Sequence, residues 1–455
     1  MNRRSHTQVI VVGAGVAGLL SALELRRTGL DCLVLEAGSR DSWASPHCLE
    51  IDTASIQNGV VPMPCPDCTV HDGTHGGILM SPGGIRFEFS TLPIRLIRYD
   101  LYLRQLLAES EAAGAAVRFD TEVTRISRTE GDSRRLSVDM VQSGNRLAAD
   151  CDLLVLATGN STRLDRQLYA HTGISRKIPS DSWVCALHEL WKIRGVNGRS
   201  VAFPAEPGRG AYVVGRHGPY SVECTWVSPS RDLASCLAGT LPGDGHPPPS
   251  EVLAMLRSKV ESGAEVLSSA GSSIPIRRPL DVLAGHGVVL IGNAACQVFP
   301  ATGCGVALAG HAAHMLAEHA GAYCRDTGKP EILWRYASSY HRRWGGIQAA
   351  SEVFTRGVRR LGRQGWDVAE LLMKVKVTNG TDFLRSLELR TPVPPAVEWV
   401  RRSGAIVRLG TRFGPLSAIM ARALAVQGLY RFSYPERPDA GAMKQFLARA
   451  STLVG

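Results

Sequence analysis

Residues 8–36 read QVIVVGAGVAGLLSALELRRTGLDCLVLE, and this stretch decides the fold. An apolar run, Val9–Val12, leads into a glycine-rich turn, a helical pattern and a second apolar run that ends at Glu36. Strand, glycines, helix, strand and terminal acid in this order are typical of the β-α-β unit that binds dinucleotides. The sequence therefore predicts a site for an ADP-containing cofactor.

Each glycine of the turn has a separate physical role. Gly13 permits a tight strand-to-helix turn, Gly15 lets the backbone approach a pyrophosphate, and Gly18 lets the helix lie close to the sheet. The helix begins near Val16 and Ala17, where free N–H groups and the positive end of the helix dipole favour phosphate.

Glu36 and the following Ala37 stand at the end of the second strand. A carboxylate at this point accepts hydrogen bonds from both ribose hydroxyls, and it would repel a 2′-phosphate. The pattern therefore favours FAD or NAD over NADP at this site.

The bulk composition is ordinary for a globular protein, with 44% apolar and 20% charged residues in 455. This length predicts two or three domains. The sequence shows no run of 18 apolar residues and no cleavable signal, which predicts a cytoplasmic protein. Eleven cysteines at irregular spacing favour reduced thiols over a disulfide framework.

Positive charge gathers in the C-terminal region. Residues 331–455 hold 20 Lys/Arg against 9 Asp/Glu, a net charge of +11, and the whole chain has a net charge of +10. One interpretation is a solvated helical face. The other is an anionic partner: a membrane surface, which would make the protein peripheral to the membrane, a phosphorylated substrate, or an acidic carrier protein. Nucleic acid is not expected, because no nucleic-acid motif accompanies the charge.

The remaining patterns predict an α/β fold in three parts. Helices are expected at 99–112, 251–265, 307–324 and, with an interruption near 392–395, from 334 to the end; strands are expected at 116–119, 122–128, 136–141, 146–149, 152–157 and 288–291. Short strands over 175–240 indicate an inserted antiparallel sheet. The predicted parts are a Rossmann-like FAD-binding domain (1–75, 94–165 and 275–330), a substrate domain (76–93 and 166–274) and a helical C-terminal domain (331–455).

A second glycine-rich turn lies in residues 288–306, VVLIGNAACQVFPATGCGV. A strand ends at Gly292 and Asn293, and Pro300, Thr302 and the glycines at 303 and 305 open another helix. Such a turn can point backbone N–H groups at an anionic or electron-rich edge. Two such turns suggest one long cofactor held at both ends, and FAD is long enough.

At these residues the chain resembles the FAD-dependent oxidoreductases that include geranylgeranyl reductases, lycopene cyclases and single-component aromatic hydroxylases. The resemblance covers roughly residues 8–320. It implies noncovalent FAD held by the matching positions: Gly13, Gly15, Gly18 and Glu36; Arg98 at the head of a helix; Val123; Gly159 in Ala157–Arg163; Gly292 and Asn293; and Pro300, Thr302, Gly303, Cys304 and Gly305.

Two positions depart from the usual pattern of the group. Thr158 and Asn293 stand where an aspartate is usual. In the hydroxylases the first aspartate helps bind both FAD and NADPH, so their reduction cycle is not implied here. An asparagine amide still hydrogen-bonds a hydroxyl, so FAD binding should survive at Asn293.

The flavin-end turn is most similar to that of the geranylgeranyl reductases. The segment Ser45–Glu50 also resembles theirs, which makes Cys48 the candidate catalytic residue, near the flavin. Gly210-Ala211-Tyr212 is similar to the start of their substrate-cavity motif, but Val214 replaces its tryptophan.

The resemblance implies an FAD-dependent oxidoreductase that acts on a small apolar or aromatic metabolite. Reduction or dehydrogenation of a carbon–carbon bond comes first, with NAD(P)H or another reductant as electron donor. Flavin-dependent monooxygenation is the alternative, and a non-catalytic FAD-binding role is the third.

Two further groups of residues carry open interpretations. Cys65, Cys68, His71 and His75 could form a zinc site or a redox-active thiol pair, or hold ordinary reduced cysteines; we assign no metal. The aromatic residues of the predicted sheet could line a substrate pocket or pack in the core: Trp183, Trp191, Tyr212, Tyr220 and Trp226.

Overall fold

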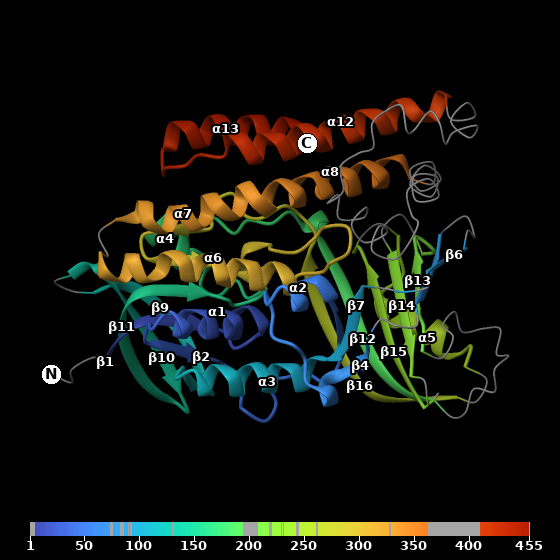
Figure 1. The fold of residues 1–455 in the computed structure, drawn as a ribbon, viewed down its shortest axis with the longest axis horizontal. Coiled ribbons are helices and arrows are strands. Elements are labelled where there is room, and N and C mark those ends of the chain that lie inside the picture. The colour runs from blue at the N-terminus through green and yellow to red at the C-terminus, as the bar shows by residue number, and fades with distance from the viewer. Residues whose placement is uncertain are drawn as a thin grey trace.

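The structure is a computed structural model that describes residues 5–72, 76–81, 86–89, 91, 93–129, 132–193, 208–217, 221–228, 230, 232–242, 245–260, 263–326, 329–362 and 410–454. It confirms the predicted α/β class, with a sheet of mainly parallel strands, an antiparallel second sheet and helices near the C-terminus (Figure 1). The expectations for His75, Tyr220 and the interruption near 392–395 fall outside the described residues.

The first sheet carries the N-terminal β-α-β unit. Its strands follow the order β17-β18-β11-β1-β2-β8, and every pair along this path except β17 with β18 is parallel. The bounds are β1 (Ser5–Val12), β2 (Cys32–Leu35), β8 (Ala116–Arg118), β11 (Asn145–Leu156), β17 (Ala284–Gly285) and β18 (Val288–Leu290). The central strands are continuously apolar because both faces of a parallel sheet are covered.

Strand β11 is one continuous element, whereas the sequence pattern suggested a hairpin arm and a separate buried strand. Its first half pairs antiparallel with β10 (Asp132–Gln142), and its end pairs parallel with β18. β10 also pairs with β9 (Thr121–Thr129). The strand therefore runs from a peripheral meander into the core, and the turn 157–160 follows at its carboxyl end.

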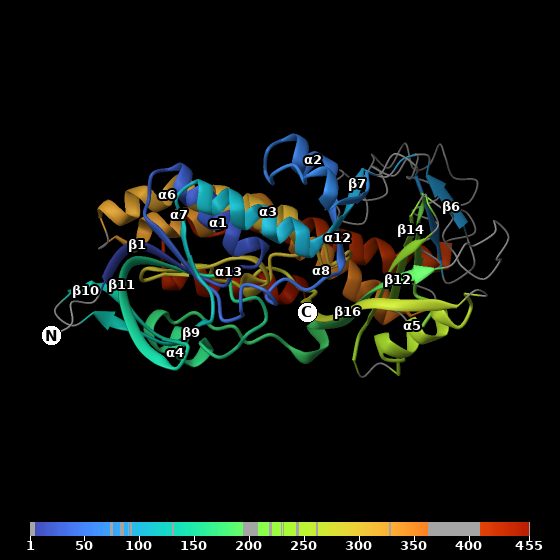
Figure 2. The same ribbon diagram turned by 90° about the horizontal axis from the view of Figure 1, so that it is seen from below.

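Three helices cover one face of the first sheet. α1 (Val16–Arg27) packs between α3 (Tyr99–Ala112) and α6 (Val306–Arg325), and Figure 2 shows the three side by side, with α4 (Asp165–Thr172) on the other face. The helices predicted at 99–112 and 307–324 are confirmed to within one residue.

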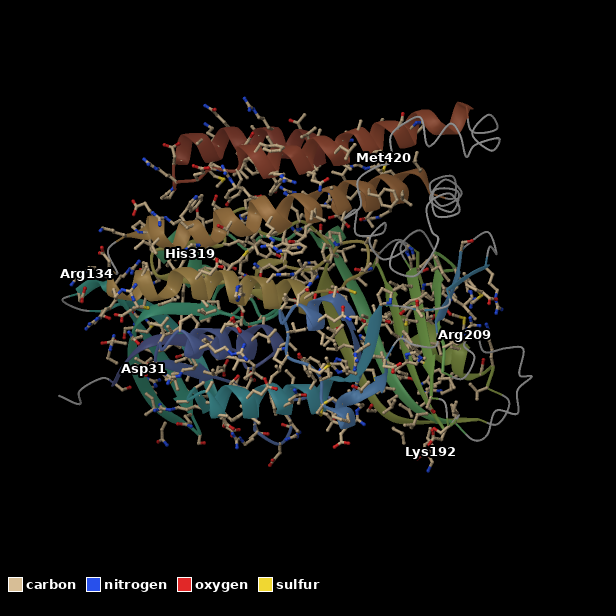
Figure 3. All side chains as sticks on the ribbon, in the orientation of Figure 1. Asp31, Arg134, Lys192, Arg209, His319 and Met420 are labelled. Atoms are coloured by element: carbon tan, nitrogen blue, oxygen red, sulfur yellow. A yellow bond between two sulfur atoms is a disulfide. The ribbon has the colours of Figure 1, made fainter. Side chains whose placement is uncertain are left out.

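The second sheet has the order β16-β12-β15-β14-β13-β5-β6, and only β13 with β5 is parallel. The bounds are β5 (Gly77–Met80), β6 (Arg86–Phe89), β12 (Trp183–Ile193), β13 (Gly210–Val214), β14 (Ser221–Val227), β15 (Leu233–Thr240) and β16 (Ala264–Pro275). Figure 3 shows Lys192 and Arg209 at this end of the molecule, and Asp31 and Arg134 at the opposite end.

The helix expected over 251–265 is wrong in its second half. α5 (Pro249–Arg257) ends early, and the chain turns through Gly263, which has a φ of +73°. β16 then pairs with β12 along its whole length. Sheet pairing with a strand some 80 residues away overrides the local helical pattern here.

A third, three-stranded sheet has the order β3-β7-β4, with both pairs antiparallel. Its strands are β3 (Cys48–Asp52), β4 (Thr69–His71) and β7 (Ile94–Arg98), and the short helices α2 (Thr53–Gln57) and η1 (Pro66–Cys68) lie between β3 and β4. Asp52 caps α2 by accepting the N–H of Ser55 at 2.9 Å. Buried residues of β3 and β7 pack in one cluster with residues of the second sheet.

The C-terminal helices form the last layers. Among the described residues they are α7 (Pro330–Tyr340), the π-helical turn η4 (His341–Gly345), α8 (Gly346–Leu361), α12 (Gly410–Ser433) and α13 (Ala440–Val454). α12 lies along α8 (Figure 1), and Trp334, Tyr430, Tyr434 and Phe446 pack together between the helices. Within the described ranges, no helix has the length and apolar character needed to cross a membrane.

Replacing Gly18 by alanine should destabilise the fold. The new methyl group would overlap the carbonyl oxygen of Gly13 and also press on Ala157. Overpacking of this kind costs about 1–3 kcal/mol, because α1 must move away from the sheet.

Gly428 in α12 is a matched control, since a methyl group there meets nothing within 4 Å. Gly428→Ala should stabilise its helix by up to about 1 kcal/mol. Denaturant unfolding of both variants measures the difference, and equal stabilities would contradict the proposed close approach of α1.

Candidate cofactor and active site

The first glycine-rich turn has the geometry that a dinucleotide site needs. Gly13 has a φ of +101°, and a Cβ there would lie 2.6 Å from the carbonyl oxygen of Ala157. At Gly15 the nearest neighbour of a Cβ would be the Tyr99 hydroxyl, 4.0 Å away. The turn is thus closed against the sheet at Gly13 and open at Gly15, where backbone approach to a pyrophosphate is required.

Glu36 fixes this turn through its carboxylate. Oε2 accepts the N–H of Ala14 at 2.8 Å, and Oε1 accepts the N–H of Gly38 at 2.8 Å. The Trp43 indole donates to the Ala14 carbonyl at 2.9 Å. Glu36 and Ala37 therefore stand beside the first turn, as the sequence suggested, and Glu36 also bonds the backbone there.

Arg98 and Val123 lie on neighbouring elements of the same region. Arg98 ends β7 and makes a two-pronged ion pair with Asp100, at 2.9 and 2.7 Å. This ion pair raises the pKa of Arg98. Val123 is buried in β9, opposite Met140. We propose these two residues, with Glu36, as the contacts to the adenosine half of the cofactor.

The second glycine-rich turn touches the first. A Cβ on Gly292, whose φ is +67°, would lie 2.6 Å from the Cβ of Ala17 at the start of α1. Gly292 and Asn293 belong to a 3-10 turn, η3 (Gly292–Ala295), that follows β18. The structure thus brings together two motifs that are almost 280 residues apart in the sequence.

Helix α8 holds the second turn from behind. The Gln348 side chain donates to the carbonyls of Cys296, at 3.0 Å, and Val298, at 2.6 Å. The Ser351 hydroxyl accepts the N–H of Ala301 at 3.2 Å. Beyond Pro300, the remaining residues of the turn are only partly buried: Thr302, Gly303, Cys304 and Gly305. We propose this surface as the contact to the flavin.

Arg176 is a buried residue that the sequence analysis missed. Its guanidinium donates to the carbonyls of Gly159, at 3.0 Å, Ser161, at 2.6 Å, and Ala294, at 3.0 Å, and pairs with Asp165 at 2.7 Å. It therefore ties the turn after β11 to the turn after β18. No spacing pattern marks this arginine in the sequence. Only its long-range contacts identify it.

Cys48 lies in β3, opposite Arg98 in the register of the third sheet. Burial raises the pKa of the Cys48 thiol, so the protein holds it protonated. Next to it, the ring of His47 lies against the tilted rings of Tyr99 and His188, with ring centroids 4.5 and 5.0 Å away. Burial lowers the pKa of His188 to about 3, so this imidazole is neutral. A catalytic role for Cys48 remains a proposal.

Glu50 is a second residue that the sequence analysis missed. It follows Cys48 by two positions on β3, and its Oε1 accepts hydrogen bonds from Tyr212 at 2.8 Å and Trp226 at 3.1 Å. The Cys224 thiol lies 3.3 Å from the same oxygen. Two of the predicted aromatic residues thus meet the third sheet here. Trp191, in contrast, is buried with Val252 and Leu253 of α5.

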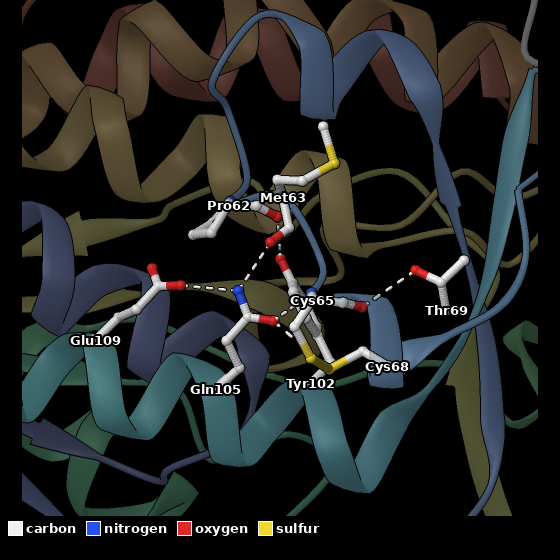
Figure 4. Close-up of a disulfide and its surroundings, with 8 residues drawn as sticks. All are labelled: Pro62, Met63, Cys65, Cys68, Thr69, Tyr102, Gln105 and Glu109. Carbon is white, nitrogen blue, oxygen red and sulfur yellow. Dashed lines mark hydrogen bonds between the residues drawn. A yellow bond between two sulfur atoms is a disulfide. The ribbon is translucent and has the colours of Figure 1, made fainter.

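Cys65 and Cys68 form a disulfide (Figure 4), so the expectation of reduced thiols is wrong for this pair. The turn into η1 brings their Cα atoms to 5.2 Å, within the usual range for a disulfide. Gln105 of α3 accepts the N–H of Cys65 at 2.8 Å, and His71 bonds the carbonyl of Gly208. Among the described residues no group of side chains could hold a metal ion.

The site consists of two glycine-rich turns in contact. Glu36 lies beside the first turn, and Gln348 of α8 supports the second. This arrangement is that of an FAD-dependent oxidoreductase. The FAD binding domain family matches residues 6–349, and the chain belongs to this family. The turns fit the cofactor because they are open at Gly15 and Gly303, where a Cβ would meet its nearest neighbour only at 4.0 and 3.6 Å.

The similar proteins include reductases and a monooxygenase. The chain is 25% identical over 348 residues to digeranylgeranylglycerophospholipid reductase 2 of Methanococcoides burtonii, and this alignment covers 73% of this chain and 80% of that protein. It is 29% identical over 184 residues to kynurenine 3-monooxygenase of Salinispora arenicola, and this alignment covers 37% of this chain and 39% of that protein. A solved geranylgeranyl bacteriochlorophyll reductase-like protein of Thermoplasma acidophilum has the same fold, with a TM-score of 0.64 and 12% identity. The match covers 99% of this chain and 98% of that protein.

Replacing Arg176 by methionine should destabilise the protein by about 3–5 kcal/mol, because Asp165 and three carbonyls lose a buried partner. It should also weaken FAD binding, because the two turns are no longer tied together. Denaturant unfolding and FAD titration measure the two effects.

Arg163 is the matched control, since its side chain is 73% exposed and pairs with Glu122 on the surface. Arg163→Met should cost less than about 1 kcal/mol. A similar loss in both variants would show that Arg176 does not tie the turns together.

Proposed function

We propose that this flavoprotein reduces a carbon–carbon double bond in an apolar, isoprenoid-like metabolite. The observation that carries the proposal is an incompletely covered face of the second sheet. On β13, Ala211 and Val213 are buried, whereas Tyr212 and Val214 on the opposite face keep accessible surface, as does Leu237 on β15. Apolar surface of this kind suits an apolar substrate.

The flavin-end turn adjoins the second sheet. A Cβ on Gly303 of this turn would lie 3.6 Å from Ile274 of β16. The pKa of Tyr212 is raised well above its usual value, first by burial and then by Glu50, Cys224 and Cys304. We therefore expect the flavin ring beside the second sheet. A substrate on the accessible face would therefore lie beside the flavin.

The bound flavin would supply hydride, and the protein would position the substrate and exclude water. Tyr212, Val214 and Leu237 would hold the apolar chain. Burial keeps Cys48 and His188 uncharged, so the surroundings favour an apolar ligand over a charged one. NAD(P)H or another reductant would supply the electrons.

Three comparisons support reduction over hydroxylation. The similarity to the archaeal reductase extends over most of this chain, whereas the similarity to the monooxygenase covers 37% of it. Thr158 stands where the hydroxylases of this group carry an aspartate. The archaeal relative is a digeranylgeranylglycerophospholipid reductase, and an isoprenoid lipid suits the apolar face described above.

The purified protein should hold noncovalent FAD, which acid precipitation releases into a yellow supernatant. After anaerobic reduction, addition of geranylgeraniol should return the oxidised flavin spectrum and yield a product two hydrogens heavier. Stopped-flow absorbance and mass spectrometry measure both. A transient absorbing species on addition of oxygen, followed by a hydroxylated product, would instead establish a monooxygenase.

For the basic C-terminal region we propose contact with an anionic membrane surface, on the cytoplasmic side. Arg342, Arg343 and Arg431 line a hollow of about 680 Å³ between α6, η4 and α12. The adjoining Phe432 is 76% exposed. Cationic and aromatic side chains together suit a lipid interface. Part of the basic region, with Arg401, Arg402 and Arg408, lies outside the described residues.

Vesicles that contain anionic lipid should sediment the protein at low salt and release it at high salt. The double change Arg343→Gln and Arg431→Gln should weaken this binding without unfolding the protein. A matched pair on β10, Arg134→Gln and Arg135→Gln, is the control. No sedimentation at low salt would leave an acidic carrier protein or a solvated face as the explanation.

A further inference from the structure

Three hydrogen-bond donors converge on one oxygen of Glu50. The Tyr212 hydroxyl, the Trp226 indole and the Cys224 thiol come from β13 and β14 of the second sheet, and all three point at Oε1. Glu50 itself comes from β3 of the third sheet. This residue therefore joins two sheets across a contact to which Leu79, Ile94 and Leu96 also contribute.

The surroundings of Glu50 act on its two protonation states in opposite directions. Burial disfavours the carboxylate, whereas three donors favour it, and burial has the larger effect, so the pKa of Glu50 is raised. A carboxyl group in this position is held neutral more easily than an ordinary glutamate. When it loses its proton, however, the donors on Oε1 are already in place to stabilise the charge.

Glu50 is also close to the face where the proposed substrate would bind. It keeps part of its surface accessible, as Tyr212 does. The second carboxyl oxygen, Oε2, receives none of the three bonds described, and Tyr212 lies near Cys304 of the flavin-end turn. Oε2 is therefore the carboxyl oxygen that can carry a proton.

We propose that Glu50 is the proton donor in the reduction of the substrate double bond, an inference that rests on the proposed function. In this step the π bond of the alkene would break, and one carbon would gain the proton from Oε2 of Glu50. Bound FAD in its reduced form would supply hydride, and with it both electrons, to the other carbon. Glu50 is left as a carboxylate that Tyr212, Trp226 and Cys224 stabilise, and water returns its proton.

Neighbouring groups are less suited to this task. The Tyr212 hydroxyl already donates to Glu50, and its pKa is raised, so it gives up a proton less readily than the carboxyl group. Burial also raises the pKa of the Cys48 thiol, and its one side-chain hydrogen-bond partner in the described residues is Ser235. Glu50, in contrast, has three donors in place to stabilise its carboxylate.

Glu50→Gln keeps the size of the side chain and removes the proton. It should leave FAD content and the reaction of the reduced protein with oxygen unchanged, and slow anaerobic reoxidation by geranylgeraniol by about 100-fold or more. The matched control is Glu189→Gln, which also removes a carboxylate that accepts an indole N–H, from Trp191 at 2.6 Å, near α5. This control should reduce the alkene like the wild type.

Infrared difference spectra give a second readout that needs neither FAD nor substrate. Subtracting the Glu50→Gln spectrum from that of the wild type should show one protonated carboxyl band that titrates above the ordinary glutamate range. Tyr212→Phe removes a donor that favours the anion, so the band should persist to higher pH, and alkene reduction should slow by about tenfold.

The outcomes separate the two hypotheses. A wild-type protein that reduces the alkene, together with a Glu50→Gln variant as fast as the control, would overturn the proton-donor role alone. So would the absence of the carboxyl band. A wild-type protein that shows the band and does not reduce alkenes would overturn the proposed function, and the role of Glu50 in it.

Discussion

The contact between the start of α1 and the turn after β18 is the constraint on which the rest of the structure depends. Gly292 lies so close to Ala17 that a side chain at 292 would overlap it. Gly13 approaches the backbone of Ala157 in the same way. Three turns at the carboxyl ends of β1, β11 and β18 therefore meet at one edge of the sheet, where open α/β sheets bind their ligands.

Much of this edge could be predicted from the sequence, because its signals are local. The order of strand, glycines, helix and acid in residues 8–36 specifies a known geometry, and the structure gives Gly13 the positive φ that the motif requires. The helix over 99–112 and the strand at 288–291 are likewise set by short apolar patterns. Local backbone chemistry is what a sequence pattern records best.

The parts that escaped prediction depend on residues far apart in the chain. Arg176 reaches Ala294 across 118 residues, and Glu50 reaches Trp226 across 176. Neither has a spacing that distinguishes it from a solvated charge. The helix expected beyond residue 257 failed because β12 offers an edge on which the chain forms β16 instead. The Cys65–Cys68 disulfide escaped because residue spacing alone does not report oxidation.

The support that α8 gives to the flavin-end turn has a consequence for how the protein is made. Gln348 follows Cys296 by 52 residues and Val298 by 50, yet its amide holds both carbonyls. A nascent chain that ends before α8 has both glycine-rich turns and lacks the side chain that fixes the second. During synthesis on the ribosome, the adenosine end of the cofactor site, which extends to Val123, is thus complete in sequence 225 residues before Gln348, which fixes the flavin end.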